Sequence, residues 1–215
     1  MSLLVAVKSS TAEMESGVHD EVRATQWYQA MRGKAVVKFF IGQQTDGMEG
    51  RVVIGSRKSY NYKSDELALD VADHAAGAVF KTRAIAQYAV GKNIDHVLMV
   101  NTQSDVLPER VWASHYKVAD YSGIFDGGWG QMGPRDISGH VMERCYSWAI
   151  GSTGYFLSRR AAYEIADAAV RVEQYIVGSR DDLWVGQILG PICASGDLFS
   201  IQLDEPVCEE KHEAS

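Results

Sequence analysis

Three short runs of apolar residues, each followed at once by small or polar residues, constrain the fold of this chain most strongly. They span residues 3–7 (LLVAV), 35–41 (AVVKFFI) and 96–100 (HVLMV). A continuous β-rich apolar run is typical of a strand that is buried on both faces of a parallel sheet. Helical segments over residues 13–31 and 65–90, the second read as one or two helices, separate the runs. This alternation predicts an α/β fold with a central mixed, mostly parallel sheet flanked by helices.

Further along the chain the pattern predicts a short helix after Pro108 and a helix over residues 159–175, with Ser158 as its N-cap. Another helix is expected over residues 181–189, and a last strand over residues 198–203.

Two polar, glycine-containing stretches, residues 45–64 and 120–140, are expected to be loops, and strand-like pieces are expected within residues 145–157. The 215-residue chain suits one domain, which we place at residues 1–205. Residues 206–215 are charged and lack apolar periodicity, so they are expected to form a flexible tail.

The charge and the missing motifs exclude several classes of protein. A net charge of −7 without clustered Lys and Arg argues against a nucleic-acid partner. The chain contains no Walker A loop, no G-x-G-x-x-G after a strand, no H-E-x-x-H and no G-x-S-x-G. These absences disfavour P-loop enzymes, dinucleotide oxidoreductases, zinc proteases and α/β-hydrolases.

Cysteine content and hydropathy bear on the compartment. Cys145, Cys193 and Cys208 are an odd count without framework spacing, which predicts reduced thiols, with one disulfide among them left open. The apolar run at residues 3–7 is too short to span a membrane and lacks the flanks of a signal peptide. The sequence therefore predicts a soluble or cytoplasmic protein with no membrane segment.

Ligands of open α/β sheets bind beyond the carboxyl ends of the strands. The polar residues that follow Val7 and Val100 are expected to line one such crevice. The pattern alone thus predicts a domain that binds a nucleotide or another small molecule.

Eight short motifs, in order along the chain, resemble those of glycosyltransferase family 31, the β-1,3-galactosyltransferase and Fringe group. The acidic pair Asp181-Asp182, followed by Leu183-Trp184-Val185-Gly186, is similar to the E-D-V-Y-V-G signature. The other matching segments are Leu3 to Ser10, Val22 to Thr25 with Trp27, Val37 to Gly42, Asp70-Val71-Ala72-Asp73, Phe80-Lys81-Thr82, His96 to Arg110 and Gly151 to Arg159.

The resemblance implies a GT-A-type fold and transfer of a sugar from a UDP-sugar to a hydroxyl of a glycan or glycoprotein, with inversion. In that chemistry a carboxylate removes the acceptor proton, and motif position assigns this role to Asp182. The neighbouring Asp181 is expected to raise the pKa of Asp182. The simpler reading is that both acids favour the start of a helix, where negative charge is stabilising.

Other candidate residues follow from motif position. The candidates for binding the donor are Lys8, Ser9, Arg23, Asp73, Lys81, Asn101 and Gln103. Some of them also have a purely structural explanation, as solvated charges on a helix, a residue at a strand end or a helix cap. Gly154, Tyr155 and Trp184 are the candidates for contact with the sugar or acceptor, although aromatic residues at such places are more often part of the core.

The sequence departs from the family at its metal site. Members usually carry an acidic D-x-D motif that holds Mn²⁺ at the diphosphate, and here those positions read Asn101-Thr102-Gln103. Asp105 is the remaining candidate ligand. Three alternatives stay open: a metal-independent transferase that uses lysine or arginine, weak metal binding through Asp105, and a non-catalytic module that binds a nucleotide sugar or a glycan.

Overall fold

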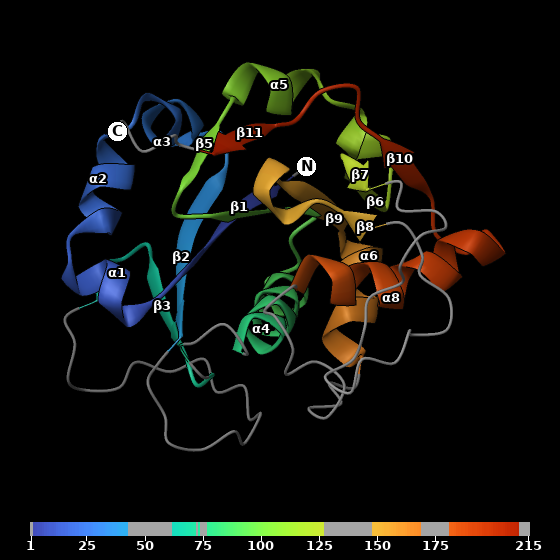
Figure 1. The fold of residues 1–215 in the computed structure, drawn as a ribbon, viewed down its shortest axis with the longest axis horizontal. Helices are drawn as coiled ribbons and strands as arrows, with labels where there is room; N and C mark the ends of the chain where they lie inside the picture. The colour runs from blue at the N-terminus through green and yellow to red at the C-terminus, as the bar shows by residue number, and fades with distance from the viewer. Residues whose placement is uncertain are drawn as a thin grey trace.

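The computed structural model describes residues 2–42, 62–71, 73, 77–126, 148–168 and 181–210. Its centre is a seven-stranded mixed sheet with the strand order β10-β6-β9-β4-β1-β2-β3 (Figure 1). The strands are β1 (Leu3–Ser9), β2 (Val36–Gly42), β3 (Glu66–Leu69), β4 (His96–Asn101), β6 (Tyr121–Gly123), β9 (Tyr155–Ser158) and β10 (Ser200–Gln202).

Parallel pairing predominates in this sheet. Strand β1 lies between β2 and β4 and pairs in parallel with both, and the pairs β2–β3 and β6–β10 are parallel as well. Only β9 runs against its neighbours β4 and β6. The predicted α/β class, with a mixed and mostly parallel central sheet, is confirmed.

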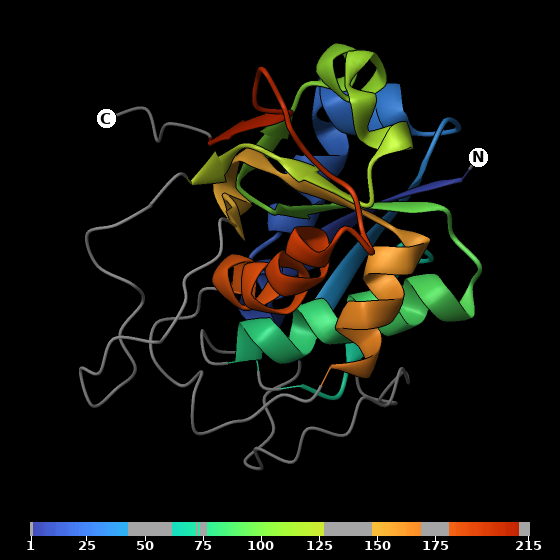
Figure 2. The same ribbon diagram turned by 90° about the vertical axis from the view of Figure 1, so that its right-hand side faces the viewer.

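Helices cover both faces of the sheet, as Figure 2 shows. On one face lie α4 (Ala78–Gly91), α6 (Arg159–Asp167) and α8 (Asp181–Ser195). The other face carries α1 (Thr11–Glu15), α2 (Val18–Ala24), α3 (Gln26–Met31), α5 (Pro108–Ala113) and the short 3-10 helix η2 (His115–Val118).

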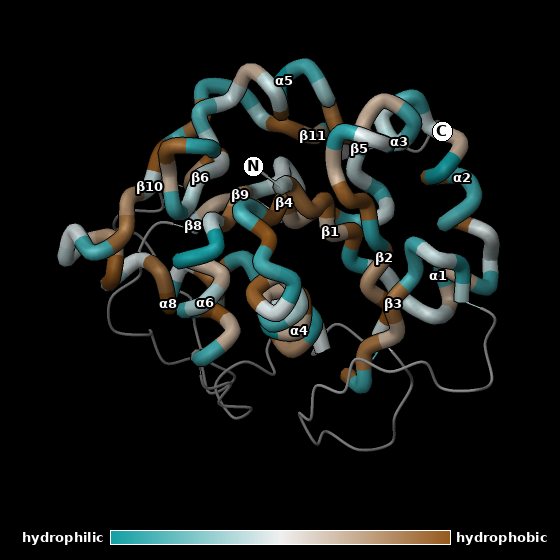
Figure 3. The backbone as a smooth tube through the Cα atoms, turned by 180° about the vertical axis from the view of Figure 1, so that it is seen from behind, coloured by the Kyte–Doolittle hydropathy of each residue, from teal (hydrophilic) through white to brown (hydrophobic). Residues whose placement is uncertain are grey.

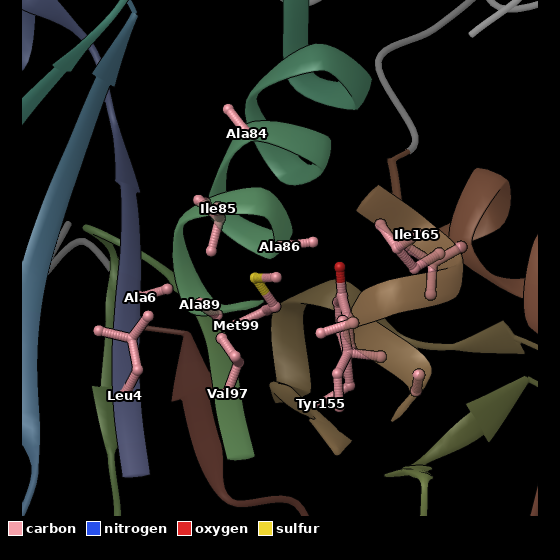
Figure 4. Close-up of a cluster of buried hydrophobic side chains, with 14 of the residues drawn as sticks. Leu4, Ala6, Ala84, Ile85, Ala86, Ala89, Val97, Met99, Tyr155 and Ile165 are labelled. Carbon is pink, nitrogen blue, oxygen red and sulfur yellow. The ribbon is translucent and has the colours of Figure 1, made fainter. Parts of the chain in front are cut away.

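The central strand explains why its sequence is apolar throughout. Leu4 and Ala6 of β1 join the hydrophobic cluster beneath α4, whereas Leu3, Val5 and Val7 join the cluster on the opposite face. The hydrophobic residues of Figure 3 gather in the inner strands, and Figure 4 shows the first cluster between the sheet and α4. Because successive side chains point to opposite faces, a strand covered on both sides needs an unbroken apolar run.

Two predicted elements are wrong. Residues 13–31 form three short helices instead of one, because Gly17 takes a left-handed conformation (φ 89°) and Thr25 is extended (ψ 151°). Thr25 accepts a hydrogen bond from the Tyr28 N–H at 3.3 Å and so caps α3. Among the described residues of the range 65–90, Glu66–Leu69 forms strand β3, and the α-helix is confined to Ala78–Gly91.

The helix after Ser158 begins as predicted, because the Ser158 hydroxyl accepts from the Ala161 N–H at 3.2 Å. It ends at Asp167, however, because Ala168 is extended. The predicted loop at residues 120–140 contains the strands β6 and β7 (Phe125–Asp126). Residues 45–61 and 127–140 of the two predicted loops lie outside the described residues.

Two small sheets complete the described chain. In one, β7 pairs with β8 (Trp148–Ala149); in the other, β5 (Ser104–Val106) pairs with β11 (Cys208–Glu210). The β5–β11 pair corrects the prediction for the tail, since Cys208–Glu210 is a paired strand.

Within the described residues Cys193 and Cys208 form no disulfide, and the Cys208 thiol lies 3.3 Å from the Ser152 carbonyl oxygen; Cys145 lies outside those residues. No helix within the described ranges is both long enough and apolar enough to cross a membrane.

Candidate functional site

The candidate site lies at the carboxyl edge of the parallel strands, where β1 ends at Lys8 and Ser9 and β4 ends at Asn101. Lys8 is the register partner of Asn101 across these two strands. The start of the antiparallel strand β9 adds Tyr155, which pairs with Met99. The strand ends that the sequence pattern expected to share a crevice therefore do meet at one edge of the sheet.

An ion pair joins this edge to the first turn of α8. Lys8 Nζ lies 2.6 Å from Asp181 Oδ2, and the two side chains are only 9% and 10% exposed. The Thr82 hydroxyl of α4 donates to the same carboxylate oxygen at 2.5 Å. Two residues of the donor and catalytic predictions are thus in direct contact, and Thr82, which lies in the Phe80-Lys81-Thr82 motif, supports them.

A second lysine reaches the end of β1 from α4. The Lys81 ammonium donates to the backbone carbonyl of Ser9 and lies 3.6 Å from Asp73 Oδ1. Burial lowers the pKa of Lys81, and the nearby Asp73 and Glu13 carboxylates oppose that shift. Burial likewise raises the pKa of Asp73, against the hydrogen bond from Thr11 and the charge of Lys81. Lys8 and Lys81 therefore bring two buried cations to one strand end.

Asp73 also holds the first helix in place. Its Oδ2 accepts from the Thr11 N–H at 2.6 Å, at the first residue of α1. Asp73 therefore acts at the start of α1 from a distant part of the chain, while Arg23 binds Asp20, Asp65 and Glu66.

Glu13 is a residue at this edge that the motif comparison missed. Its Oε2 accepts from the Ser9 hydroxyl at 3.1 Å and from the Ser10 N–H at 2.8 Å, and its Oε1 accepts from the Thr102 hydroxyl. The signal was present in the sequence, because Ser10 and Glu13 have the spacing of a capping box, which the structure contains. Through Thr102, Glu13 brings a carboxylate to the Asn101-Thr102-Gln103 segment, which occupies the position of the acidic motif in the glycosyltransferase family that the chain resembles.

The loop after β4 gives little support to a metal site. Asn101 is half-buried, and its N–H donates to the Ser104 hydroxyl at 3.1 Å, whereas Gln103 is exposed. Asp105 is exposed on β5, where Glu209 of β11 is its register partner. Within the described ranges, no group of three or more His, Cys, Asp or Glu side chains is placed to hold a metal ion.

Asp182 is bound by backbone N–H groups. Its Oδ2 accepts from Gly151 at 3.0 Å and its Oδ1 from Leu183 at 2.8 Å. Both acids lie in the first turn of α8, as the simpler reading predicted, and both are buried. Asp182 thus ties α8 to the 3-10 helix η3 (Gly151–Thr153).

Arg23 is not part of the group around Lys8. Its guanidinium donates twice to Asp65, at 2.8 and 2.9 Å, and to Glu66 at 2.5 Å and Asp20 at 2.7 Å. Asp65 precedes β3, and Glu66 begins it, aligned with Phe39 of β2. These contacts give Arg23 a structural role that fixes α2 against β3, and its contact with a donor stays a prediction.

The two aromatic candidates for sugar stacking are core residues. Tyr155 is fully buried and Trp184 is 1% exposed, and both belong to the cluster between the sheet and α4 (Figure 4 labels Tyr155). Burial raises the pKa of Tyr155, as do the charges of Asp181 and Asp182. Neither ring offers a face to a sugar in this structure, so the core alternative holds for both.

Gly154 is explained by its backbone. Its φ is 73° and its ψ is 146°, a combination nearly restricted to glycine, and an added Cβ would lie 2.9 Å from Cys208 Sγ. The glycine lets the segment before β11 pack against the start of β9.

No model of a known protein family and no curated protein sequence matches the chain. Among solved structures, the chain is similar to a glycosyltransferase involved in the glycosylation of the major capsid of PBCV-1, with a TM-score of 0.37 and 10% sequence identity. The similarity covers 77% of this chain and 63% of that one, so it spans less than two thirds of the length of that protein.

Proposed function

We propose that the chain is a glycosyltransferase that moves a sugar from a UDP-sugar donor to a hydroxyl of a glycan or glycoprotein acceptor, with inversion. The observation that carries the proposal is the meeting of Lys8 and Lys81 at the end of the central strand β1, each beside a carboxylate. Both residues are donor-site candidates by motif resemblance.

The two lysines suit a diphosphate leaving group. An ammonium group has three hydrogen-bond donors, so Lys8 can keep Asp181 and still donate to a phosphate oxygen. Fixed positive charges that face the oxygen atoms where negative charge develops stabilise the transition state. In this proposal Lys8 and Lys81 supply the charge that Mn²⁺ supplies in family members with an acidic motif; Asp105 remains the candidate ligand if a metal is also used.

Asp182 is the proposed general base. It lies on the first turn of α8, next to the Asp181–Lys8 ion pair, so acceptor and donor chemistry would meet at this helix start. Removal of the acceptor proton by Asp182 would proceed as the diphosphate departs to the lysine side, with inversion at the sugar carbon.

The test is hydrolysis or transfer from a panel of UDP-sugars, comparing the wild-type chain with Asp182→Asn. The exposed Asp197→Asn is the matched control because it makes the same chemical change outside the site. The proposal expects turnover that Asp182→Asn abolishes and Asp197→Asn preserves. Turnover that survives in Asp182→Asn would refute the role of Asp182.

The alternative is a non-catalytic module that binds a nucleotide sugar or a glycan. It is favoured by the occupation of both Asp182 oxygens by backbone N–H groups, together with the Asn101-Thr102-Gln103 segment. Binding of UDP without turnover of any donor would support the module.

A further inference from the structure

A buried chain of polar side chains runs from the end of β1 to the start of β3. The Ser9 Oγ lies 2.6 Å from His19 Nε2, and His19 Nδ1 lies 2.9 Å from Glu66 Oε1. Ser9, His19 and Glu66 are 3%, 2% and 7% exposed. Neither the motif comparison nor the proposed chemistry uses His19, which lies in α2.

The order of these three groups is that of a serine–histidine–acid triad, but Ser9 does not suit a nucleophile. A nucleophile must reach its substrate, and the Ser9 hydroxyl is buried and also lies 3.1 Å from Glu13 Oε2. This arrangement holds Ser9 in place.

Counting the protons defines the charge of His19. The Glu66 carboxylate can only accept, so His19 Nδ1 carries a proton. Ser9 has one hydroxyl proton, and Glu13 Oε2, which already accepts from the Ser10 N–H, is an acceptor for it. The Ser9 hydroxyl also lies 3.5 Å from the Ser10 carbonyl oxygen, but its two closer contacts, with His19 and Glu13, are both hydrogen bonds only if His19 Nε2 also carries a proton and donates to Ser9 Oγ.

The surrounding charges favour the same state. The Glu66 carboxylate on β3 binds the ring directly, whereas Glu13 on α1 is connected to it through Ser9, and Asp65, which precedes β3, binds Arg23. The Arg23 guanidinium is bound to Asp65 and Glu66, while Lys81, at the Ser9 carbonyl, has Asp73 as its ion-pair partner. The direct contact with the Glu66 carboxylate favours a charged imidazole, and the same carboxylate oxygen also binds Arg23. The ring stacks on Phe39, with the two ring centroids 4.2 Å apart.

We propose that His19 is held as an imidazolium and is the positioning residue of the donor site. It fixes the Ser9 hydroxyl between two partners, and the Ser9 backbone carbonyl in turn receives Lys81. This inference rests on the proposed function only in assigning Lys81 to the donor diphosphate; the charge of His19 does not depend on it.

The charge is tested by NMR of the full chain labelled with ¹⁵N-histidine at pH 7. His96 is an internal reference, because burial lowers its pKa and keeps it neutral. The expected spectrum shows two protonated nitrogens for His19 and one unprotonated nitrogen for His96. A neutral His19 with a single protonated nitrogen would overturn the proposal.

The positioning role is tested by calorimetric titration of UDP into His19→Gln and into His115→Gln, the exposed histidine that serves as control. His19→Gln should bind UDP roughly tenfold more weakly, about the loss of one charge-assisted hydrogen bond, and His115→Gln should match the wild type. Unchanged affinity in a folded His19→Gln would overturn the positioning role. If the wild type binds no UDP, the proposed function fails, whereas the NMR result still decides the charge. If His19→Gln does not fold, the NMR spectrum of the wild-type chain still decides the charge of His19.

Discussion

Replacing Asp181 with asparagine should destabilise the fold strongly, because it breaks a buried ion pair while leaving the other charge in place. The carboxylate receives Lys8 Nζ at 2.6 Å and the Thr82 hydroxyl at 2.5 Å. Both charged side chains are about one-tenth exposed, so Lys8 cannot recover full hydration by turning to solvent.

The size of the effect follows from this burial. Removing one partner of a buried pair costs about 3–5 kcal/mol, mainly through the uncompensated charge. Asparagine keeps an oxygen that can accept from Thr82 or Lys8, so the lower end, about 3 kcal/mol, is expected. For a chain of this size, that loss lowers the melting temperature by roughly 6–12 °C.

Urea unfolding followed by circular dichroism measures this loss. The control is Asp20→Asn, the same change at a carboxylate that is 65% exposed and pairs with Lys63 and Arg23. It should leave stability close to wild type, because Asp20 is well solvated and Arg23 keeps its contacts with Asp65 and Glu66. The double variant Lys8→Met/Asp181→Asn should be more stable than the sum of the single losses predicts, since it removes both charges. An Asp181→Asn midpoint as close to wild type as that of Asp20→Asn would refute the reasoning.

Three further predictions concern the backbone, the pH response and the donor. Gly154→Ala should lower the free energy of unfolding by at least about 2 kcal/mol, through backbone strain and through the contact of the new Cβ with Cys208 Sγ. The control Gly33→Ala, at φ 84° with nothing within 4 Å of the added Cβ, introduces backbone strain alone, so equal urea midpoints for the two variants would contradict the effect of the contact. Burial lowers the pKa of His96 from about 6.5, so below pH 6.5 the unfolded chain binds a proton at His96 before the folded chain does. The free energy of unfolding is therefore highest above about pH 6.5 and falls as the pH drops below it. His96→Gln should flatten that fall in urea melts between pH 7 and pH 5, and an unchanged slope would be the contrary result. Lys8→Met/Asp181→Asn should bind UDP roughly 10–100-fold more weakly by calorimetry, with the exposed Lys117→Met as control, and unaltered affinity would remove Lys8 from the donor site.

The buried strands could be predicted because a strand covered on both faces consists of consecutive apolar residues. The apolar runs at residues 3–7, 35–41 and 96–100 each fall within or overlap an observed strand of the sheet. Strand β3 was missed because Glu66–Leu69 is short and begins with a glutamate. That glutamate is buried with His19 and Arg23 of α2 as partners. Such long-range pairing leaves no local pattern.

The candidate site was predictable in part for the same reason. Lys8 and Asp181 lie in recognisable motifs, and the structure brings them into contact across 173 positions of sequence. Arg23, Tyr155 and Trp184 also lie in motifs, yet their surroundings are acids or core. Motif position fixes where a residue lies on its element, whereas its partners depend on tertiary packing.

The central claim is that Lys8 and Lys81 form a site for the diphosphate of a UDP-sugar. Calorimetric titration of UDP, with GDP and CMP as controls, with and without Mn²⁺, tests it most directly. We predict selective binding of UDP that persists without metal. Absence of UDP binding under both conditions would contradict the donor assignment and leave the α/β fold alone.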